Sequence, residues 1–317
     1  MPDKVLVYSR FPKAQLIRFG ERYELLNAAG KRLDEAFPVA ELADVSAMIT
    51  AGGTPLRGDA MDMLPKLGAI VCYGTGYDGV DLKAAAARNI AVGHSPGANA
   101  AAVADVAVML MLATTRRLVV ADRYVRDGSW AEAKPSPLMK PPPSLGGCKV
   151  GVYGMGAIGR KIAARVAAFE TDIGYFSRTR YDDLPYRYFQ SLDALAEWCT
   201  VLMIAVRAGA ETTHAVNADL LKKLGPDGHV VNISRGSVID QAALLSALKD
   251  GSIAGAGLDV FETEPHVPDE LTAQPNLVVT PHIGGNTREA HVAMQACVIA
   301  NLAAFFAGEK LPYRVKS

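Results

Sequence analysis

Short apolar runs recur along the first third of the chain, at residues 4–9, 45–50, 68–73 and 90–94. Polar, glycine or proline residues separate them, and the alanine-rich stretch at 82–88 has the composition of a helix. Strands that alternate with helices in this way are typical of βαβ units, whose strands are parallel. The first third therefore predicts a parallel sheet.

A second, longer series of apolar runs covers residues 149–153, 172–177, 200–206, 229–234, 254–260 and 277–280. Helical patterns lie between them, and strands at this spacing favour a doubly wound, nucleotide-binding sheet. A long helical pattern at 287–308 follows, which we expect to return to the first domain. The expected fold class is α/β with two doubly wound parallel-sheet domains: residues 98–285 form one domain, inserted into another made of residues 1–97 and 286–317.

An apolar helix and a proline-rich segment lie between the two series. The apolar stretch at 100–113 is interrupted by Asp105 and is too short to cross a bilayer. We therefore expect a buried helix, placed between domains or at a subunit interface. Residues 134–144 contain several prolines, which favour a stiff, extended loop or linker.

The composition narrows the classes of partner. A chain of 317 residues with 50% apolar content can form two cores. Its 33 Lys and Arg residues balance its 33 Asp and Glu residues, which argues against nucleic acid or a membrane surface as a partner. The N-terminus lacks the apolar core of a signal peptide, and the four cysteines show no metal-binding spacing. We expect a cytoplasmic protein with reduced thiols and no metal site.

The first candidate site is a glycine-rich turn between a strand and a helix. In a dinucleotide-binding turn of this spacing, the first glycine permits a tight bend and the second lets a pyrophosphate approach the backbone. The third glycine lets helix and strand pack closely. We expect the whole segment to bind a cofactor: Gly154, Met155, Gly156, Ala157, Ile158 and Gly159.

The end of the next strand indicates which cofactor binds. About 20 residues past the glycines, NAD-binding turns carry an Asp or Glu that holds the ribose hydroxyls. Here the strand ends instead in Ser177, Arg178 and Thr179, followed by Arg180. A guanidinium and hydroxyls can bind a 2′-phosphate that a carboxylate would repel. We expect NADP(H) to be preferred, with NAD(H) as the alternative.

Polar side chains also follow three later strands. Arg235, Asp259 and His282 stand directly beyond apolar runs, and a further carboxylate, Glu264, lies on the loop after the second of them. The carboxyl ends of parallel strands share one edge of the sheet, where ligands bind. We expect His282, paired with Glu264, to donate a proton to a carbonyl oxygen as a hydride arrives. Arg235 would bind the carboxylate of a 2-keto acid.

A glycine-rich loop in the first third adds a second candidate anion site. Residues 73–79 read Tyr-Gly-Thr-Gly-Tyr-Asp-Gly, and the amides of Gly74, Thr75 and Gly76 can form a nest for a carboxylate. With Arg235 opposite, the substrate carboxylate would be held from two sides.

These motifs resemble the D-isomer-specific 2-hydroxyacid dehydrogenase family over nearly the whole chain. The resemblance is carried by residues 74–81, 150–159, 232–240, 255–265 and 280–285. It implies a Rossmann cofactor domain inserted into a flavodoxin-like substrate domain, and a homodimer built through helices of the cofactor domain. It also implies roles for single residues: catalysis by Arg235, Glu264 and His282, cofactor contacts from Ile233 and Asp259, and substrate contacts from Gly74, Thr75 and Gly76.

Within the family, residues 175–179 and 264–268 are similar to the branch that reduces glyoxylate, hydroxypyruvate and hydroxyphenylpyruvate and tends to prefer NADPH. The resemblance thus implies reduction of small 2-keto acids to D-2-hydroxy acids. A phosphoglycerate-type or formate-type dehydrogenase and a nucleotide-sensing protein like the C-terminal-binding corepressors stay open as alternatives. One departure is the loop at 206–214, which gains Arg207 and loses two prolines that the family usually has.

Overall fold

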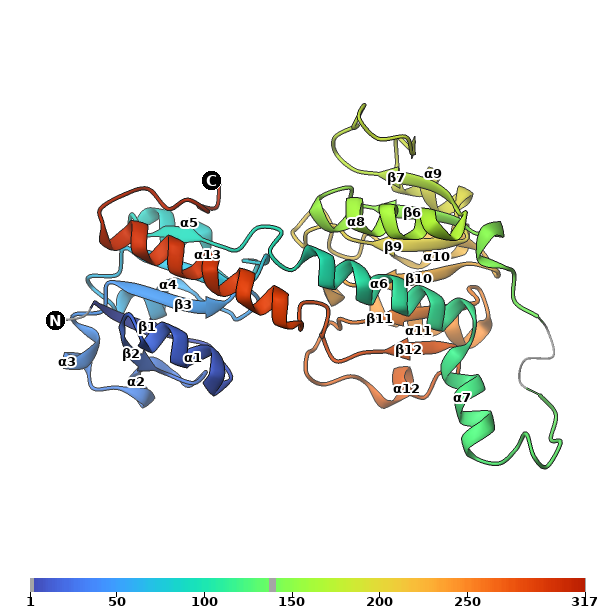
Figure 1. Cartoon of the computed structure of the whole chain (residues 1–317), viewed down its shortest axis with the longest axis horizontal. Helices are drawn as coiled ribbons and strands as arrows, with labels where there is room; N and C mark the ends of the chain where they lie inside the picture. The colour runs from blue at the N-terminus through green and yellow to red at the C-terminus, as the bar shows by residue number, and fades with distance from the viewer. Residues whose placement is uncertain (1–2, 137–140, 317) are drawn as a thin grey trace. The chain divides into compact units, whose positions relative to one another are not determined.

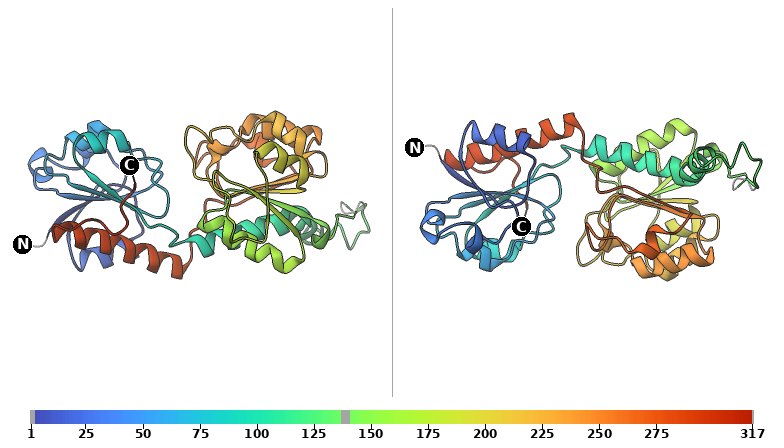
Figure 2. Two further views of the ribbon diagram at one scale, coloured as in Figure 1. Left: turned by 90° about the horizontal axis from the view of Figure 1, so that it is seen from above. Right: turned by 90° about the horizontal axis from the view of Figure 1, so that it is seen from below.

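The computed structural model describes residues 3–136 and 141–316. The chain divides into two compact units: the first unit is Met1–Asn99 with Asn286–Ser317, and the second unit is Ala100–Gly285. Each unit has a parallel sheet with helices on both faces (Figure 1, Figure 2). The predicted α/β class is confirmed. Residues 137–140 of the proline-rich segment lie outside the described residues.

The strands of the first unit are β1 (Lys4–Val7), β2 (Glu24–Asn27), β3 (Ala47–Ala51), β4 (Ala69–Tyr73) and β5 (Ala91–Gly93). Its helices are α1 (Lys13–Gly20), α2 (Leu33–Ala36), α3 (Val39–Leu42), α4 (Gly58–Asp62), α5 (Leu82–Ala87) and α13 (Arg288–Phe306). The strand order is β2-β1-β3-β4-β5, and every neighbouring pair is parallel.

Consecutive residues of one strand enter opposite layers of the core in this unit. On β4, Ile70 packs in the cluster that includes Met61 of α4. The next residue, Val71, packs in the cluster with Phe19 of α1 and Leu302 of α13. Because both faces of the strand are buried, its sequence is a continuous apolar run instead of an alternating one.

The C-terminal helix α13 packs one face against the sheet of the first unit. By length and composition alone it could cross a membrane, a test that the core helices of soluble proteins also pass. Its Val298 and Leu302 are fully buried against the five-stranded sheet. The helix therefore returns to the first sheet, as its place after the second series of strands predicted.

The strands of the second unit are β6 (Lys149–Tyr153), β7 (Asp172–Phe176), β8 (Arg187–Tyr188), β9 (Val201–Ile204), β10 (His229–Asn232), β11 (Gly255–Leu258) and β12 (Leu277–Val279). Its α-helices are α6 (Ala100–Thr115), α7 (Leu118–Arg126), α8 (Ala157–Val166), α9 (Leu192–Trp198), α10 (Ala218–Leu224), α11 (Gln241–Asp250) and α12 (Asp269–Thr272). Short 3₁₀ turns are η1 (Leu145–Gly147), η2 (Ala167–Phe169) and η3 (Gly236–Val238). The strands pair in parallel in the order β12-β11-β10-β9-β6-β7-β8.

Helix α6 belongs to the core of the second unit. Val103, Leu110 and Met111 are buried in one cluster with residues of α8 and of the sheet. A Cβ at Gly257 of β11 would lie 3.0 Å from Cβ of Leu110, so this glycine lets the helix rest directly on the strand. The expected burial is seen, and the expected placement between domains or at a subunit interface stays a prediction. The apolar sequence indicated burial but not the surface against which the helix is buried.

A pair of isoleucines tests the assignment of the first core. Ile49 of β3 is fully buried, whereas Ile17 of α1 is 55% exposed. We expect Ile49→Ala to lower the free energy of unfolding by about 2–5 kcal/mol, because it removes apolar contacts and leaves a cavity. The same change at Ile17 should cost less than about 0.5 kcal/mol. Urea titration measures both, and equal midpoints would contradict the placement of Ile49.

Candidate active site

The glycine-rich turn joins β6 to α8, and the fold requires glycine at two of its three glycine positions. Gly154 has φ +100°, and a Cβ there would lie 2.8 Å from the carbonyl of Ala205. A Cβ at Gly159 would lie 2.0 Å from the carbonyl oxygen of Gly154, so this position needs glycine for helix–strand packing. A Cβ at Gly156 would meet no heavy atom within 4 Å. The space beside Gly156 is therefore open, as a pyrophosphate at the start of a helix requires.

The loop after β7 carries the residues that we expect to favour NADP(H) over NAD(H). Ser177 Oγ donates to the carbonyl of Thr179 at 2.5 Å, and Arg178 is exposed. The hydroxyl of Tyr175 accepts from the amide of Tyr181 at 2.8 Å and donates to its carbonyl at 3.2 Å. These bonds close the loop on itself, so that residues 177–180 form a compact turn beyond the strand.

Two carboxylates just beyond this loop were missed in the sequence. Asp182 pairs with Arg180 at 3.3 Å, and Asp183 pairs with Arg160 of α8 at 2.7 Å. The Arg160 guanidinium also lies 4.4 Å from the ring centre of Tyr181. Each carboxylate thus has its own arginine, and the turn keeps the exposed positive charge of Arg178.

His282 and Glu264 form an ion pair at the edge of the same sheet. His282 Nδ1 lies 2.7 Å from Glu264 Oε2, while Glu264 Oε1 accepts from the amide of Phe261 at 3.0 Å. Burial by itself raises the pKa of the Glu264 carboxyl, but the hydrogen bonds from His282 and Phe261 and the charges of His282 and Arg235 outweigh burial and hold that pKa below its ordinary value. Glu264 is therefore ionised near neutrality. Because Nδ1 of His282 contacts Glu264, the other ring nitrogen, Nε2, can contact another group.

Asp259 holds the loop on which His282 stands. Its buried carboxylate accepts from Thr280 Oγ1 at 2.7 Å and from the amides of Ile283 and Gly284 at 2.8 Å each. The amide of His282 donates to the carbonyl of Asp259 at 2.9 Å. His282 itself has φ +53°, a conformation that a non-glycine residue adopts only when its surroundings impose it. The nicotinamide contact expected of Asp259 stays a prediction.

Arg235 lies on the loop after β10, which the Asn232 side chain shapes. Asn232 Nδ2 donates to the carbonyl of Arg235 at 2.9 Å, and Asn232 Oδ1 accepts from the amide of Ser234 at 3.0 Å. Ile233 is buried beneath this turn. The Arg235 charge acts on the carboxyl of Glu264, so the structure brings Arg235, Glu264 and His282 to one edge of the second unit.

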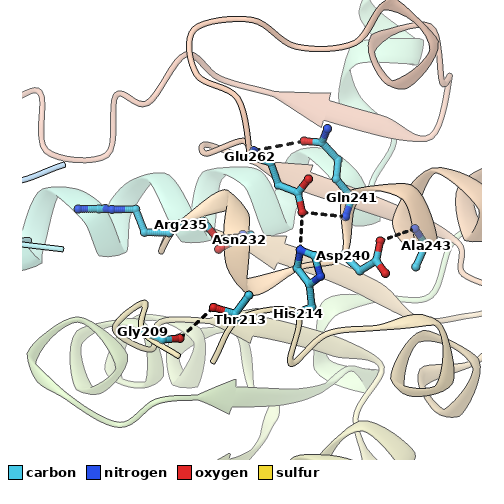
Figure 3. A network of polar contacts seen from close by, with 9 residues as sticks. All are labelled: Gly209, Thr213, His214, Asn232, Arg235, Asp240, Gln241, Ala243 and Glu262. Atoms are coloured by element: carbon cyan, nitrogen blue, oxygen red, sulfur yellow. Dashed lines mark hydrogen bonds and ion pairs between the residues drawn. The ribbon is translucent and has the colours of Figure 1, made fainter. Parts of the chain in front are cut away.

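A second His–Glu pair at this edge was not found in the sequence. His214 Nε2 lies 2.8 Å from Glu262 Oε1, and Figure 3 shows this pair beside Gln241, with the Arg235 side chain extending away from it. The signal was present in both motifs: His214 closes the loop at 206–214, and Glu262 stands two residues before Glu264. The two residues are 48 positions apart, and only the topology of the sheet joins them.

The glycine-rich loop at 74–79 belongs to the first unit. Gly74 has φ +106°, and Thr75 Oγ1 donates its proton to Asn99 Oδ1 at 2.8 Å and lies 3.1 Å from the carbonyl oxygen of Ser95. A Cβ at Gly52 would lie 1.7 Å from the carbonyl oxygen of Gly76, so the neighbouring loop packs tightly against this one. The loop is thus fixed within its own unit, and its binding of a carboxylate stays a prediction.

Neither a metal site nor a disulfide is seen in the described part of the chain. No group of three or more His, Cys, Asp or Glu residues there could hold a metal ion. The four cysteines are free thiols, and burial raises the pKa of Cys72 and Cys199 to about 12. These two thiols therefore stay protonated near neutrality and are unreactive.

Known proteins match this chain over most of its length. A family model for the D-isomer specific 2-hydroxyacid dehydrogenase, NAD binding domain, matches residues 108–284. A 2-ketogluconate reductase of Gluconobacter oxydans is 40% identical over 267 residues, which are 84% of this chain and 85% of that protein. A glyoxylate/hydroxypyruvate reductase of Arabidopsis thaliana is 37% identical over 284 residues, 90% of this chain and 87% of that protein.

A solved structure is similar to the chain as well. An NADPH-dependent glyoxylate/hydroxypyruvate reductase of Sinorhizobium meliloti, in complex with NADP and malonate, is 38% identical with a TM-score of 0.90. The match covers 99% of this chain and 97% of that one. Because the family model spans more than half of the chain and the relatives match it nearly end to end, the protein belongs to the D-isomer specific 2-hydroxyacid dehydrogenase family and is an NAD(P)-dependent 2-hydroxyacid dehydrogenase.

Proposed function

We propose that this protein uses NADPH to reduce small 2-keto acids, such as glyoxylate, hydroxypyruvate and aryl pyruvates, to D-2-hydroxy acids. The observation that carries the proposal is the His282–Glu264 pair with Arg235 at the carboxyl edge of the sheet that holds the glycine-rich turn. The similar proteins are reductases of 2-ketogluconate, glyoxylate and hydroxypyruvate, and one of them is NADPH-dependent.

When bound, the cofactor would supply a hydride for the carbonyl carbon of the keto acid. His282 donates the proton to the carbonyl oxygen from Nε2, since Nδ1 is on Glu264. The ionised Glu264 stabilises the imidazolium before the transfer and orients the ring. Arg235 binds the substrate carboxylate with a forked pair of hydrogen bonds and polarises the carbonyl.

The residues of the turn and of the β7 loop fit NADPH in the proposal. The open space at Gly156 and the first turn of α8 would receive the pyrophosphate. Ser177, Arg178 and Thr179 would hold the 2′-phosphate, with Arg178 as the charged partner because Arg180 is engaged by Asp182. NADH would bind the same turn without this last contact.

We also propose the roles of the two domains and the assembly. Residues 98–285 would hold the cofactor, while residues 1–97 and 286–317 would bind the substrate carboxylate through Gly74, Thr75 and Gly76. The protein would act as a cytoplasmic homodimer. The support for a dimer is the apolar surface of α7 and the segment after it, where Leu118, Val125 and Trp130 are more than half exposed.

Initial rates test the reaction and its cofactor together. We expect the wild type to oxidise NADPH with glyoxylate, hydroxypyruvate or phenylpyruvate, and to use NADH less well. Arg178→Ala should raise KM for NADPH about 10- to 100-fold, the value of a charge-assisted contact, and leave NADH unchanged. Arg180→Ala is the matched control and should have a smaller effect. Cofactor binding without turnover of any keto acid would instead favour a nucleotide-sensing protein.

Two of the three glycines of the turn, Gly156 and Gly159, separate packing from cofactor binding. Gly159→Ala should lower the thermal midpoint of the apoprotein, because its Cβ would lie 2.0 Å from a backbone oxygen. Gly156→Ala should leave that midpoint nearly unchanged but weaken NADPH binding, because its Cβ would occupy the open space. Differential scanning fluorimetry and fluorescence titration measure the two effects. If Gly156→Ala still bound NADPH tightly, the pyrophosphate would not bind beside Gly156.

The lowered pKa of the Glu264 carboxyl predicts how the stability of the folded chain changes with pH. Because its pKa is lower in the folded chain than its ordinary value of 4.5, its ion pair contributes stability above pH 4.5 and loses it as the pH falls through the lowered pKa. Above pH 4.5, Glu264→Gln should therefore have a lower thermal midpoint than the wild type. This difference in midpoint, the gap, should shrink as the pH falls. Glu270→Gln, at an exposed ion pair with Lys249, is the control and should show little gap. A gap that is constant with pH would show that the Glu264 charge is not its source.

A further inference from the structure

We propose that His214 and Glu262 are positioning residues: their ion pair holds together the loops after β9, β10 and β11 and thereby fixes Arg235 and Glu264 for catalysis. The inference rests on the proposed function, which gives Arg235 and Glu264 their roles. It adds two residues that need not touch substrate or cofactor.

The pair joins three segments that are far apart in sequence. His214 ends the loop after β9, and its Nε2 lies 2.8 Å from Oε1 of Glu262, on the loop after β11 (Figure 3). The same Oε1 accepts from the amide of Gln241 at 3.5 Å, and the Gln241 side chain accepts from the amide of Glu262 at 3.4 Å. Gln241 is the first residue of α11, which follows the Arg235 loop.

The first link leads from the pair to Glu264. The amide of Phe261, the residue before Glu262, donates to Glu264 Oε1 at 3.0 Å. The other carboxylate oxygen, Oε2, binds His282. A shift of the backbone at 261–262 would therefore move the carboxylate that orients the proton donor.

The second link leads to Arg235 through direct backbone contact. Gly236 follows Arg235, and a Cβ there would lie 1.9 Å from the carbonyl carbon of Phe261 and 2.2 Å from the nitrogen of Glu262. The two loops are thus in van der Waals contact with no side chain between them. On the other side, the amide of His214 donates to the carbonyl of Ser237 at 2.8 Å. The Arg235 loop is held between the two members of the pair.

The pair itself is too exposed to serve mainly as a source of stability. The side chains of His214 and Glu262 are 50% and 30% exposed, and ion pairs at this exposure contribute little to the free energy of unfolding. His214 nevertheless adopts φ +51°, which costs energy in a non-glycine residue. In contrast, displacement of a catalytic group by about 1 Å can reduce the rate about 100-fold. The contact between His214 and Glu262 should therefore affect the position of the catalytic groups more than the stability of the fold.

The test compares alanine variants with variants that keep the hydrogen bond. We expect His214→Ala and Glu262→Ala each to lower kcat/KM for the keto acid about 10- to 100-fold, through both kcat and KM, while KM for NADPH changes little. His214→Gln and Glu262→Gln keep a donor and an acceptor and should retain most of the activity. The double alanine variant should be no worse than either single one, because both remove the same contact.

Glu270→Ala is the matched control, because Glu270 forms an exposed ion pair with Lys249 of α11 at 2.8 Å, in the same unit. It should leave kcat and KM unchanged. The inference is overturned if the alanine variants lower only the thermal midpoint, if the two single effects multiply in the double variant, or if Gln fails to rescue. A wild type that reduces no 2-keto acid would reject the proposed function instead, independently of these comparisons.

Discussion

Burial of the parallel strands on both faces is the constraint on which the rest of this structure depends. Strands such as β9, whose residues enter clusters on both faces of the sheet, are fully buried, so that a polar side chain placed within them would be costly. Polar chemistry is therefore confined to the strand ends, and parallel pairing brings the carboxyl ends to a single edge. His282, Glu264 and Arg235 stand on different loops and still meet there, because each loop begins where a buried strand stops.

The same constraint explains which parts of the fold could be predicted from the sequence. Strands buried on both faces are continuous apolar runs, and the inner strands β6, β7, β9, β10 and β11 each coincide with a predicted run, as does the edge strand β12. Two strands were missed, β2 and β8, and both lie at the edge of a sheet. An edge strand is covered less completely: β2 has the mixed sequence Glu-Leu-Leu-Asn with exposed ends. Its residues therefore carry no apolar run to recognise.

The single residues of the candidate site and the pair of His282 with Glu264 could be predicted from the sequence, but the other contacts between its loops could not. Glycine spacing and positions beyond strands identify Gly154, Arg235 and His282, because these signals are local. The ties between loops, such as His214 to Glu262 or Thr280 to Asp259, join residues 48 and 21 positions apart. Such contacts follow from the order of the strands in the sheet, which apolar runs alone do not determine. The sequence also gave no sign that Asp182 and Asp183 would each be matched by an arginine.

The pairing of Asp182 and Asp183 with arginines bears on how the proposed preference for NADPH over NADH could be altered. Arg160 starts on the helix that follows the glycines, yet its guanidinium ends on Asp183 and over Tyr181, beside the turn at 177–180. An ion pair and a ring contact thus link α8, which we propose to bind the pyrophosphate, to the loop that we propose to bind the 2′-phosphate. Replacement of Arg178 by an acidic residue would add a third carboxylate beside Asp182 and Asp183. Only two cations, Arg160 and Arg180, would then be left to pair with the three. If the cofactor binds as proposed, a change of its preference from NADPH to NADH must therefore balance the charges of the whole segment and not of one position alone.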